Sequence, residues 1–165
     1  MNNIIRLPDP GFRLKGACKV ITRSVFSGEI VDIQEASNIL FPAYLNAIVK
    51  DLALDLRLST PKVMAFSRTG VDADPVPTEL DDEFRSGVSR FYSDDVYQIV
   101  SVLGSAEGNS GGGNIRSIGF YIGEDATTTP GTGTLCSLIN TLNVAKSSAL
   151  EVTFQYEITF GAASE

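Results

Sequence analysis

The sequence contains no histidine and no tryptophan. Without imidazole side chains, the chain has neither the base of a Ser-His-Asp triad nor a histidine ligand for a metal. Without indole rings, it lacks the aromatic platform that sugar-binding clefts often use. No apolar run approaches the ~18 residues of a membrane-spanning helix, and the N-terminus lacks the charged and apolar regions of a signal peptide. We therefore expect synthesis in a cytoplasm and no histidine-dependent chemistry.

Cysteine is also scarce, and one sign of charge is in excess. Cys18 and Cys136 each lie in an apolar stretch. In a reducing cytoplasm a free cysteine commonly packs as a small hydrophobic side chain, so we expect both in the core. The net charge of −7 argues against binding to nucleic-acid phosphates, which requires clustered Lys and Arg. The acidic surplus favours solubility, and attraction to a basic partner surface is the alternative.

The clearest positive signal is the alternation of apolar and polar residues from Leu150 to Phe160. Successive side chains of a strand point to opposite faces, so this segment is predicted to be a strand with one apolar face. Such a strand needs a sheet partner and a second layer over its apolar face. We therefore expect this strand to be central to the core.

Other segments also have strand patterns. Residues 17–26 and 29–35 are rich in β-branched side chains and are separated by Ser27-Gly28, which predicts a hairpin. Further strands are predicted at 62–67, 87–92, 95–103, 115–122 and 134–139.

Two segments have helical patterns. Apolar residues recur at intervals of three and four within residues 42–56, and Pro42 suits a first helical turn, so a helix is predicted there, ended by Thr60-Pro61. Residues 79–85 are predicted to form a helical turn capped by Thr78. Together the elements predict a mainly β fold, an antiparallel β-sandwich or jelly-roll-like domain with one helix near 42–56.

The chain is predicted to form one β-rich domain, residues 13–165, preceded by an extended N-terminal arm, residues 1–12. A domain of this length buries roughly 70% of its unfolded surface. The arm ends in proline and glycine residues, which do not favour a regular element. Its apolar residues Ile4, Ile5 and Leu7 are candidates for contact with another protein, since their burial would offset the entropy lost when the arm becomes ordered.

The segment 115–122 is apolar on both faces. Ile118 and Phe120 would point to one face and Tyr121 to the other. A strand of this kind is typically covered on both sides, here by its own domain and by a neighbouring chain. Tyr121 is therefore a further candidate interaction residue.

Groups of residues that could carry chemistry lack the spacing that their chemistry needs. The glycine-rich residues 107–114 lack the lysine and the following helix of a phosphate-binding loop. Asp72 and Asp74 begin an acidic loop, but Pro75 and Pro77 interrupt the ligand spacing of an EF-hand. Composition leaves a Ser–Lys dyad and paired glycosidase carboxylates open, although no local motif supports either. We expect no catalytic residue, no cofactor and no metal.

Several short motifs follow one another along the chain. They are Gly28-Glu29-Ile30, the T-x-L-x-x-E-x-R segment from Thr78 to Arg85, Glu107-Gly108-Asn109, Ile115-Arg-Ser-Ile-Gly-Phe120, Gly133-Thr134-Leu135, Lys146 and the closing alternating strand. This order, over residues 17–160, resembles that of small structural proteins of tailed bacteriophages, of the fibre, collar and spike type. The chain departs from that pattern at Ser117, where an acidic residue is common, and at residues 124–132, which resemble an insertion.

The resemblance implies a β-sandwich or jelly-roll module without catalysis or cofactor, made in the host cytoplasm and built into a virion. We therefore expect a structural protein at the neck, collar or tail, acting as a fibre or spike base or as an adaptor. The expected partners are other virion structural proteins and further copies of this chain, as a homo-oligomer and typically a trimer, with no nucleic acid and no membrane.

Three alternatives remain. A capsid decoration protein on the head belongs to the same broad class. A carbohydrate-binding module or small glycan hydrolase belongs to another class, and would need a groove lined by exposed tyrosines and paired carboxylates. A secreted bacterial adhesin is disfavoured by the lack of a signal-peptide pattern.

Overall fold

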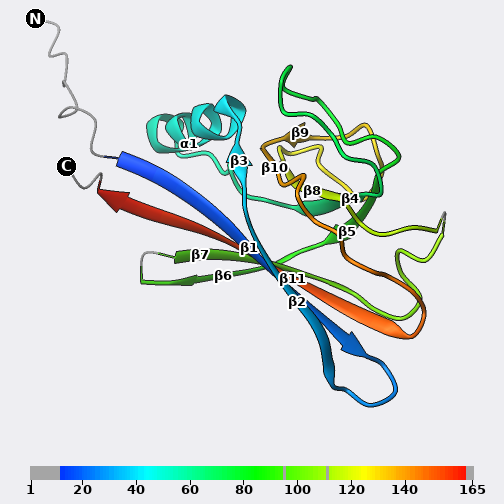
Figure 1. The fold of residues 1–165 in the computed structure, drawn as a ribbon. Helices are drawn as coiled ribbons and strands as arrows, with labels where there is room; N and C mark the ends of the chain where they lie inside the picture. The colour runs from blue at the N-terminus through cyan, green and yellow to red at the C-terminus, as the bar shows by residue number, and fades with distance from the viewer. Residues whose placement is uncertain (1–11, 95, 111, 163–165) are drawn as a thin grey trace, which may run out of the picture.

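The computed structural model describes residues 12–94, 96–110 and 112–162, and Figure 1 shows its ribbon. In chain order the elements are β1 (Phe12–Ser24), β2 (Ile30–Ser37), β3 (Ile39–Leu40), α1 (Pro42–Leu54), β4 (Val63–Ser67), β5 (Phe84–Gly87), β6 (Ser89–Ser93), β7 (Val96–Leu103), β8 (Ser117–Ile122), β9 (Thr134–Leu135), β10 (Ser137–Leu138) and β11 (Leu150–Ala162). The strand pairings among them are antiparallel. The predicted mainly β fold with one helix is confirmed.

A five-stranded sheet forms one layer, in the order β2-β1-β11-β7-β6. β11 lies at its centre, with β1 on one side and β7 on the other. Four apolar side chains of β11 share one face and are each 0% exposed; they are Val152, Phe154, Tyr156 and Ile158. The prediction that the last strand is central to the core is therefore confirmed.

The second layer covers that face with the four-stranded sheet β5-β4-β8-β9 and with α1 (Figure 1). Phe66 of β4 packs on Phe154 with 4.7 Å between ring centroids. Phe120 of β8 packs edge to face with Tyr156 at 5.3 Å, and Tyr44 of α1 packs in the same way with Phe120 at 5.1 Å. One core is thus shared by both sheets and by the inner side of the helix.

The strand order does not confirm the jelly-roll alternative. β1 and β2 form a hairpin at one edge of the five-stranded sheet, and β6 and β7 form another at the opposite edge. The architecture is an antiparallel β-sandwich in which these two hairpins flank the central strand.

A second, smaller core covers the outer face of the four-stranded sheet. Tyr121 of β8 packs there with Val71, Leu80 and Ala126, which belong to loops. All residues of β8 are buried. The prediction that this strand is covered on both faces is confirmed, and loops of the same chain provide the second cover.

α1 begins with Pro42 as predicted. It ends at Leu54, short of the predicted end at residue 56, and the backbone turns left-handed at Asp55 with φ of 52°. Thr60-Pro61, expected to end the helix, lies beyond this stop.

The predicted helical turn at residues 79–85 is wrong. The chain turns at Asp81-Asp82 instead, with φ of 47° at Asp82, and enters β5. In the extended chain Arg85 Nε donates to Glu83 Oε1 at 2.7 Å. Residues two apart do not face each other on a helix, so the contact between these two side chains favours the strand.

Candidate interaction surface

One side of α1 is held in the core. Tyr44 and Ala47 are 2% and 8% exposed, and Ile48 packs partly against the same cluster. These residues lie three and four positions apart, so they share one face of the helix. Burial raises the pKa of the Tyr44 hydroxyl.

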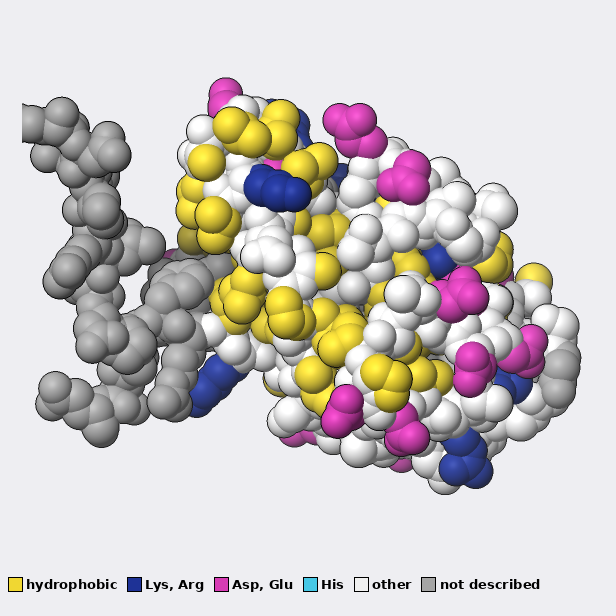
Figure 2. Space-filling model, turned by 90° about the horizontal axis from the view of Figure 1, so that it is seen from above, with side chains coloured by type: hydrophobic (Ala, Val, Ile, Leu, Met, Phe, Trp, Pro, Cys, Tyr) yellow, Lys and Arg dark blue, Asp and Glu magenta, His cyan; other side chains and the backbone are white. Residues whose placement is uncertain are grey.

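A second side of α1, next to the buried one, is also apolar, but it is exposed. Leu45, Val49 and Leu52 are 45%, 63% and 83% exposed, and their spacing of four and three residues makes them neighbours on the helix surface. Leu54 and Leu56, at the end of the helix, are 64% and 41% exposed. In the space-filling view, hydrophobic side chains gather over the part of the surface where α1 lies (Figure 2). We name these five residues the α1 outer face.

The sequence pattern predicted this helix without separating its two sides. The apolar residues within 42–56 span more of the helix circumference than one buried face needs. A surface helix is normally polar outside its buried face. This excess was the signal in the sequence for the exposed apolar residues of α1.

A groove of about 530 Å³ adjoins the α1 outer face. It is lined by Leu14, Lys15, Gly16, Ser37, Asn38, Leu40 and Leu45. Leu45 belongs to both surfaces, so they are continuous. We name this groove the edge groove, because it lies along β1 where β2 ends. Asn38 in the lining of the edge groove is anchored to the core, because its side-chain amide donates a hydrogen bond to the hydroxyl of Tyr156.

A smaller hollow of about 240 Å³ borders the inner side of α1. It is lined by Tyr44, Ile48, Ser59, Thr60, Tyr92 and Tyr97. Tyr92 is 71% exposed. Burial raises the pKa of Tyr97, against the opposing charge of Arg90. The hollow offers aromatic surface and hydroxyl groups, but none of the described residues lining it is acidic, whereas glycan hydrolysis requires paired carboxylates.

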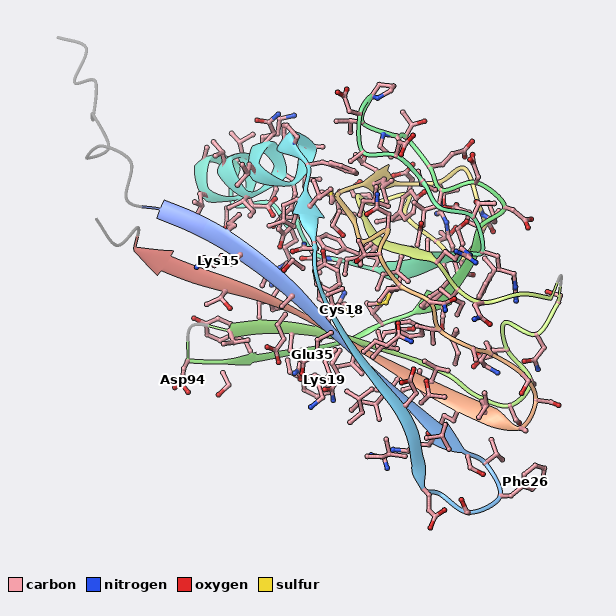
Figure 3. All side chains as sticks on the ribbon, in the orientation of Figure 1. Lys15, Cys18, Lys19, Phe26, Glu35 and Asp94 are labelled. Atoms are coloured by element: carbon pink, nitrogen blue, oxygen red, sulfur yellow. The ribbon has the colours of Figure 1, made fainter. Side chains whose placement is uncertain are left out.

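The β1–β2 hairpin presents a separate apolar surface. The N–H of Ser24 donates to the carbonyl of Glu29 at 2.9 Å and closes the turn, which confirms the predicted hairpin. Phe26 at the tip is 87% exposed and points away from the rest of the molecule (Figure 3). Val25 and Ile30 beside it are 46% and 47% exposed. We name these three residues the hairpin tip.

Tyr121, which the sequence suggested as an interaction residue, is 1% exposed. Its hydroxyl donates to Glu83 Oε2 at 2.7 Å, and the Arg85 guanidinium lies 3.7 Å from its ring centroid. Burial, together with the hydrogen bond to Glu83, raises the pKa of Tyr121. Arg85 Nη1 also donates to the carbonyls of Thr132 (2.7 Å) and Thr127 (3.1 Å). The cluster fastens a loop onto the sheet, so the structure places Tyr121 in internal contacts rather than on the surface.

Two cationic side chains hold the glycine-rich loop in place. Lys146 Nζ donates to Asn109 Oδ1 at 2.9 Å, and Arg68 donates to the carbonyl of Gly108. Burial lowers the pKa of Lys146, against the opposing effect of Glu107. Both cations are thus engaged by atoms of the loop itself.

Cys18 and Cys136 are both buried and unbridged in the described chain, as predicted. Burial raises the pKa of each thiol to about 12, and the charge of Glu157 adds to the effect at Cys18. Both thiols are therefore protonated at neutral pH. Among the described residues, no three or more Cys, Asp and Glu side chains come together in a way that could hold a metal ion. In the same part of the chain, no helix has both the length and the apolar character to cross a membrane.

The other candidate interaction residues, Ile4, Ile5 and Leu7, lie outside the described residues. So does the predicted arm, residues 1–12, apart from Phe12, which begins β1. On the described chain, a partner would meet apolar surface at the α1 outer face, the edge groove and the hairpin tip. Comparison with models of known families, with curated proteins and with solved structures found no match for this chain.

Proposed function

We propose that this chain is a non-enzymatic structural component of a tailed-phage virion, at the neck, collar or tail, where it acts as a fibre or spike base or as an adaptor. Its partners are other virion structural proteins and further copies of itself, with a trimer as the expected assembly. The motif order over residues 17–160 supports the assignment to a virion. The α1 outer face is the observation that carries the role in assembly.

The α1 outer face is suited to a lasting contact between subunits. Fully burying a leucine side chain contributes roughly 1.5–3 kcal/mol, and Leu52 and Leu54 alone are 83% and 64% exposed. Part of that gain offsets the entropy lost on association. Interfaces of permanent assemblies are more apolar than those of transient ones. An apolar helix face of this kind is therefore better explained by a neighbouring subunit than by permanent contact with water.

The motifs behind the resemblance support a rigid building block. Glu83 and Arg85 of the T-x-L-x-x-E-x-R segment form a buried ion pair with 2.6 Å between Arg85 Nη2 and Glu83 Oε1. Lys146 and Asn109 hold the glycine-rich loop. These residues are used to fix loops onto the sandwich, which suits a structural module whose surface must keep one shape.

The proposal is tested in particles of a phage that encodes this chain. Mass spectrometry of purified particles should detect the protein, and antibody labelling in electron microscopy should place it at the neck, collar or tail. A Val49→Glu/Leu52→Glu variant should fold normally but fail to enter particles, because charged groups replace the apolar contact. Asn46→Glu adds a charge at another exposed position of the same helix and is the matched control. Absence of the wild-type protein from particles would refute the proposal.

The same labelling distinguishes the nearest alternative. Signal over the capsid surface rather than the neck or tail would identify a head decoration protein.

The hollow lined by Tyr92 and Tyr97 is the observation that favours the second candidate function, a carbohydrate-binding module. Glycan-array binding that Tyr92→Ala abolishes would favour that function. Binding that is absent, or unchanged in this variant, would remove it.

A further inference from the structure

The edge groove runs along a strand edge that is open in the described chain. β1 pairs with β11 from Phe12 to Ser24 but with β2 only from Ala17 onward. The N–H of Asn38 donates to the carbonyl of Gly16 at 3.2 Å. Backbone groups of alternate residues point to the same side of a strand, so the N–H and C=O of Leu14 face that side as well. No strand within the described ranges pairs with β1 there.

The same edge is bordered by apolar side chains. Leu14, Leu40 and Leu45 come from β1, β3 and α1 and line one groove. An open strand edge beside an apolar groove has the two elements that recognise an extended peptide: backbone groups that pair with it, and a pocket for alternate side chains.

We propose that the edge groove binds residues 3–7 of a second copy of this chain as an added β-strand. The proposal rests on the proposed function, in which several copies come together, and identifies how they are joined. Residues 3–7 read Asn-Ile-Ile-Arg-Leu, a segment without proline that can pair along its whole length. Ile5 and Leu7 share one face of such a strand and Arg6 lies on the other, so Ile5 and Leu7 enter the groove.

The residues that connect this segment to β1 indicate exchange between copies. Pro8 and Pro10 are followed by Gly11, and β1 begins at Phe12. A residue that precedes proline is disfavoured in the α region, so Leu7 and Asp9 both prefer extended backbone. Extended backbone at these positions disfavours the tight reversal that would fold residues 3–7 onto their own β1. This linker sequence therefore favours placing residues 3–7 on another copy, and reciprocal or cyclic exchange of identical segments closes a symmetric oligomer.

Crosslinking between co-expressed chains tests the exchange. One chain carries Ile5→Cys and a size tag, and the other carries Leu45→Cys. The native Cys18 and Cys136 are buried and do not compete. A short bis-maleimide should join the two chains into a tagged heterodimer. A chain with Phe26→Cys in place of Leu45→Cys is the matched control, because Phe26 is exposed but lies at the hairpin tip, and it should give no heterodimer above background.

Each outcome decides the proposal. A chain that carries both Ile5→Cys and Leu45→Cys should form linked oligomers. If it forms only internally linked monomers, residues 3–7 return to their own groove and the exchange is overturned. If neither experiment gives a link specific to the groove, the segment does not bind there and the proposal is also overturned.

A second measurement does not depend on crosslinking. A chain lacking residues 2–7 should be monomeric by light scattering and should bind a fluorescent peptide of residues 1–8. Leu45→Glu should reduce that binding at least tenfold, whereas Phe26→Glu should leave it unchanged. Equal binding by both variants would contradict the edge groove as the site. Incorporation into particles is measured separately. Protein that enters particles without a link between residues 3–7 and the edge groove would overturn the strand exchange but not the proposed function. Linked protein that is absent from particles would overturn the proposed function but not the strand exchange.

Discussion

The side-chain amide of Asn38 occupies the space beside Gly16 where any other residue would place its Cβ atom. A Cβ on Gly16 would lie 1.8 Å from Asn38 Oδ1 and 2.2 Å from Asn38 Cγ. The backbones of the two residues are also hydrogen-bonded at 3.2 Å. The two residues therefore pack directly against each other at the point where β2 leaves β1 and the edge groove begins.

Replacing Gly16 with alanine should destabilise the fold by about 1–3 kcal/mol, the usual cost of overpacking. The added methyl group would displace the Asn38 amide from the hydroxyl of Tyr156. Urea unfolding measures the loss. The Gly16→Ala/Asn38→Ala double variant should show a favourable coupling energy. Gly70→Ala, where nothing lies within 4 Å of the added atom, is the control and should be close to neutral. A neutral Gly16→Ala would contradict close packing between Gly16 and Asn38.

Replacing Phe154 or Tyr156 with aspartate should unfold the domain. Both side chains are 0% exposed, and an unpaired charge there costs several kcal/mol against a total stability of ~5–15 kcal/mol. Gln155 lies between them on the other face of β11 and is half-buried, so Gln155→Lys should cost less than ~0.5 kcal/mol. Circular dichroism and urea unfolding compare the variants. A large effect of Gln155→Lys would mean that another layer or subunit covers this face.

Replacing Glu83 with glutamine should destabilise the fold by about 3–5 kcal/mol, because Arg85 would remain buried without its counter-charge. The two side chains are 4% and 0% exposed. Adding Arg85→Met to Glu83→Gln should recover part of the loss, since it removes the uncompensated charge. Glu79→Gln, at an exposed position, is the matched control. Equal stability of Glu83→Gln and Glu79→Gln would refute a structural role for the ion pair.

Replacing Asp51 with asparagine should lower the free energy of unfolding in a way that depends on pH. Burial acts to raise the pKa of Asp51, but hydrogen bonds from the hydroxyl and backbone N–H of Ser59 and from the N–H of Leu58 hold it below its usual value. A carboxyl whose pKa is lowered on folding stabilises the fold above its unfolded pKa of about 4, and loses that contribution as the pH falls through the folded value.

The difference between wild type and Asp51→Asn should therefore be constant near neutral pH and shrink below about pH 4. Unfolding titrations at several pH values measure it. Asp55→Asn, at the exposed end of the helix where asparagine tolerates the left-handed backbone, is the control. A difference that grows in acid would contradict the assigned hydrogen bonds.

Deleting residues 2–11 should leave a soluble, folded domain that no longer enters particles. The described hydrophobic clusters are built from Leu14 onward, and we expect Ile4, Ile5 and Leu7 to supply apolar side chains for a partner. Circular dichroism checks the fold, and composition of purified particles checks incorporation. The expectation fails if the full-length chain is a monomer at micromolar concentration and the truncated chain still assembles into particles normally.

The sequence alone determined the elements whose periodicity reports burial directly. The alternation from Leu150 to Phe160 predicted the central strand, and the change to helical spacing predicted α1, because each period follows from the backbone geometry of one element. Ser27-Gly28 predicted the hairpin turn for the same local reason. The acids and bases of residues 79–85 were locally compatible with a helical turn, and a contact between Glu83 and Arg85 in extended geometry decided against it.

Only the tertiary structure decided which apolar side chains are covered, and by what. Tyr44 and Leu45 are adjacent apolar residues of one helix, yet the first lies against Phe120 and the second lines an exposed groove. The sequence made Tyr121 a candidate surface residue, but loops that contain Val71 and Leu80, distant in sequence, and the nearby Ala126 cover it. The need for glycine at position 119 is explained by β10, which passes so close that a Cβ would lie 2.4 Å from the carbonyl oxygen of Ser137. Periodicity predicts which side chains of an element share a face. The residues that pack against each face are distant in sequence, so the local pattern cannot identify them.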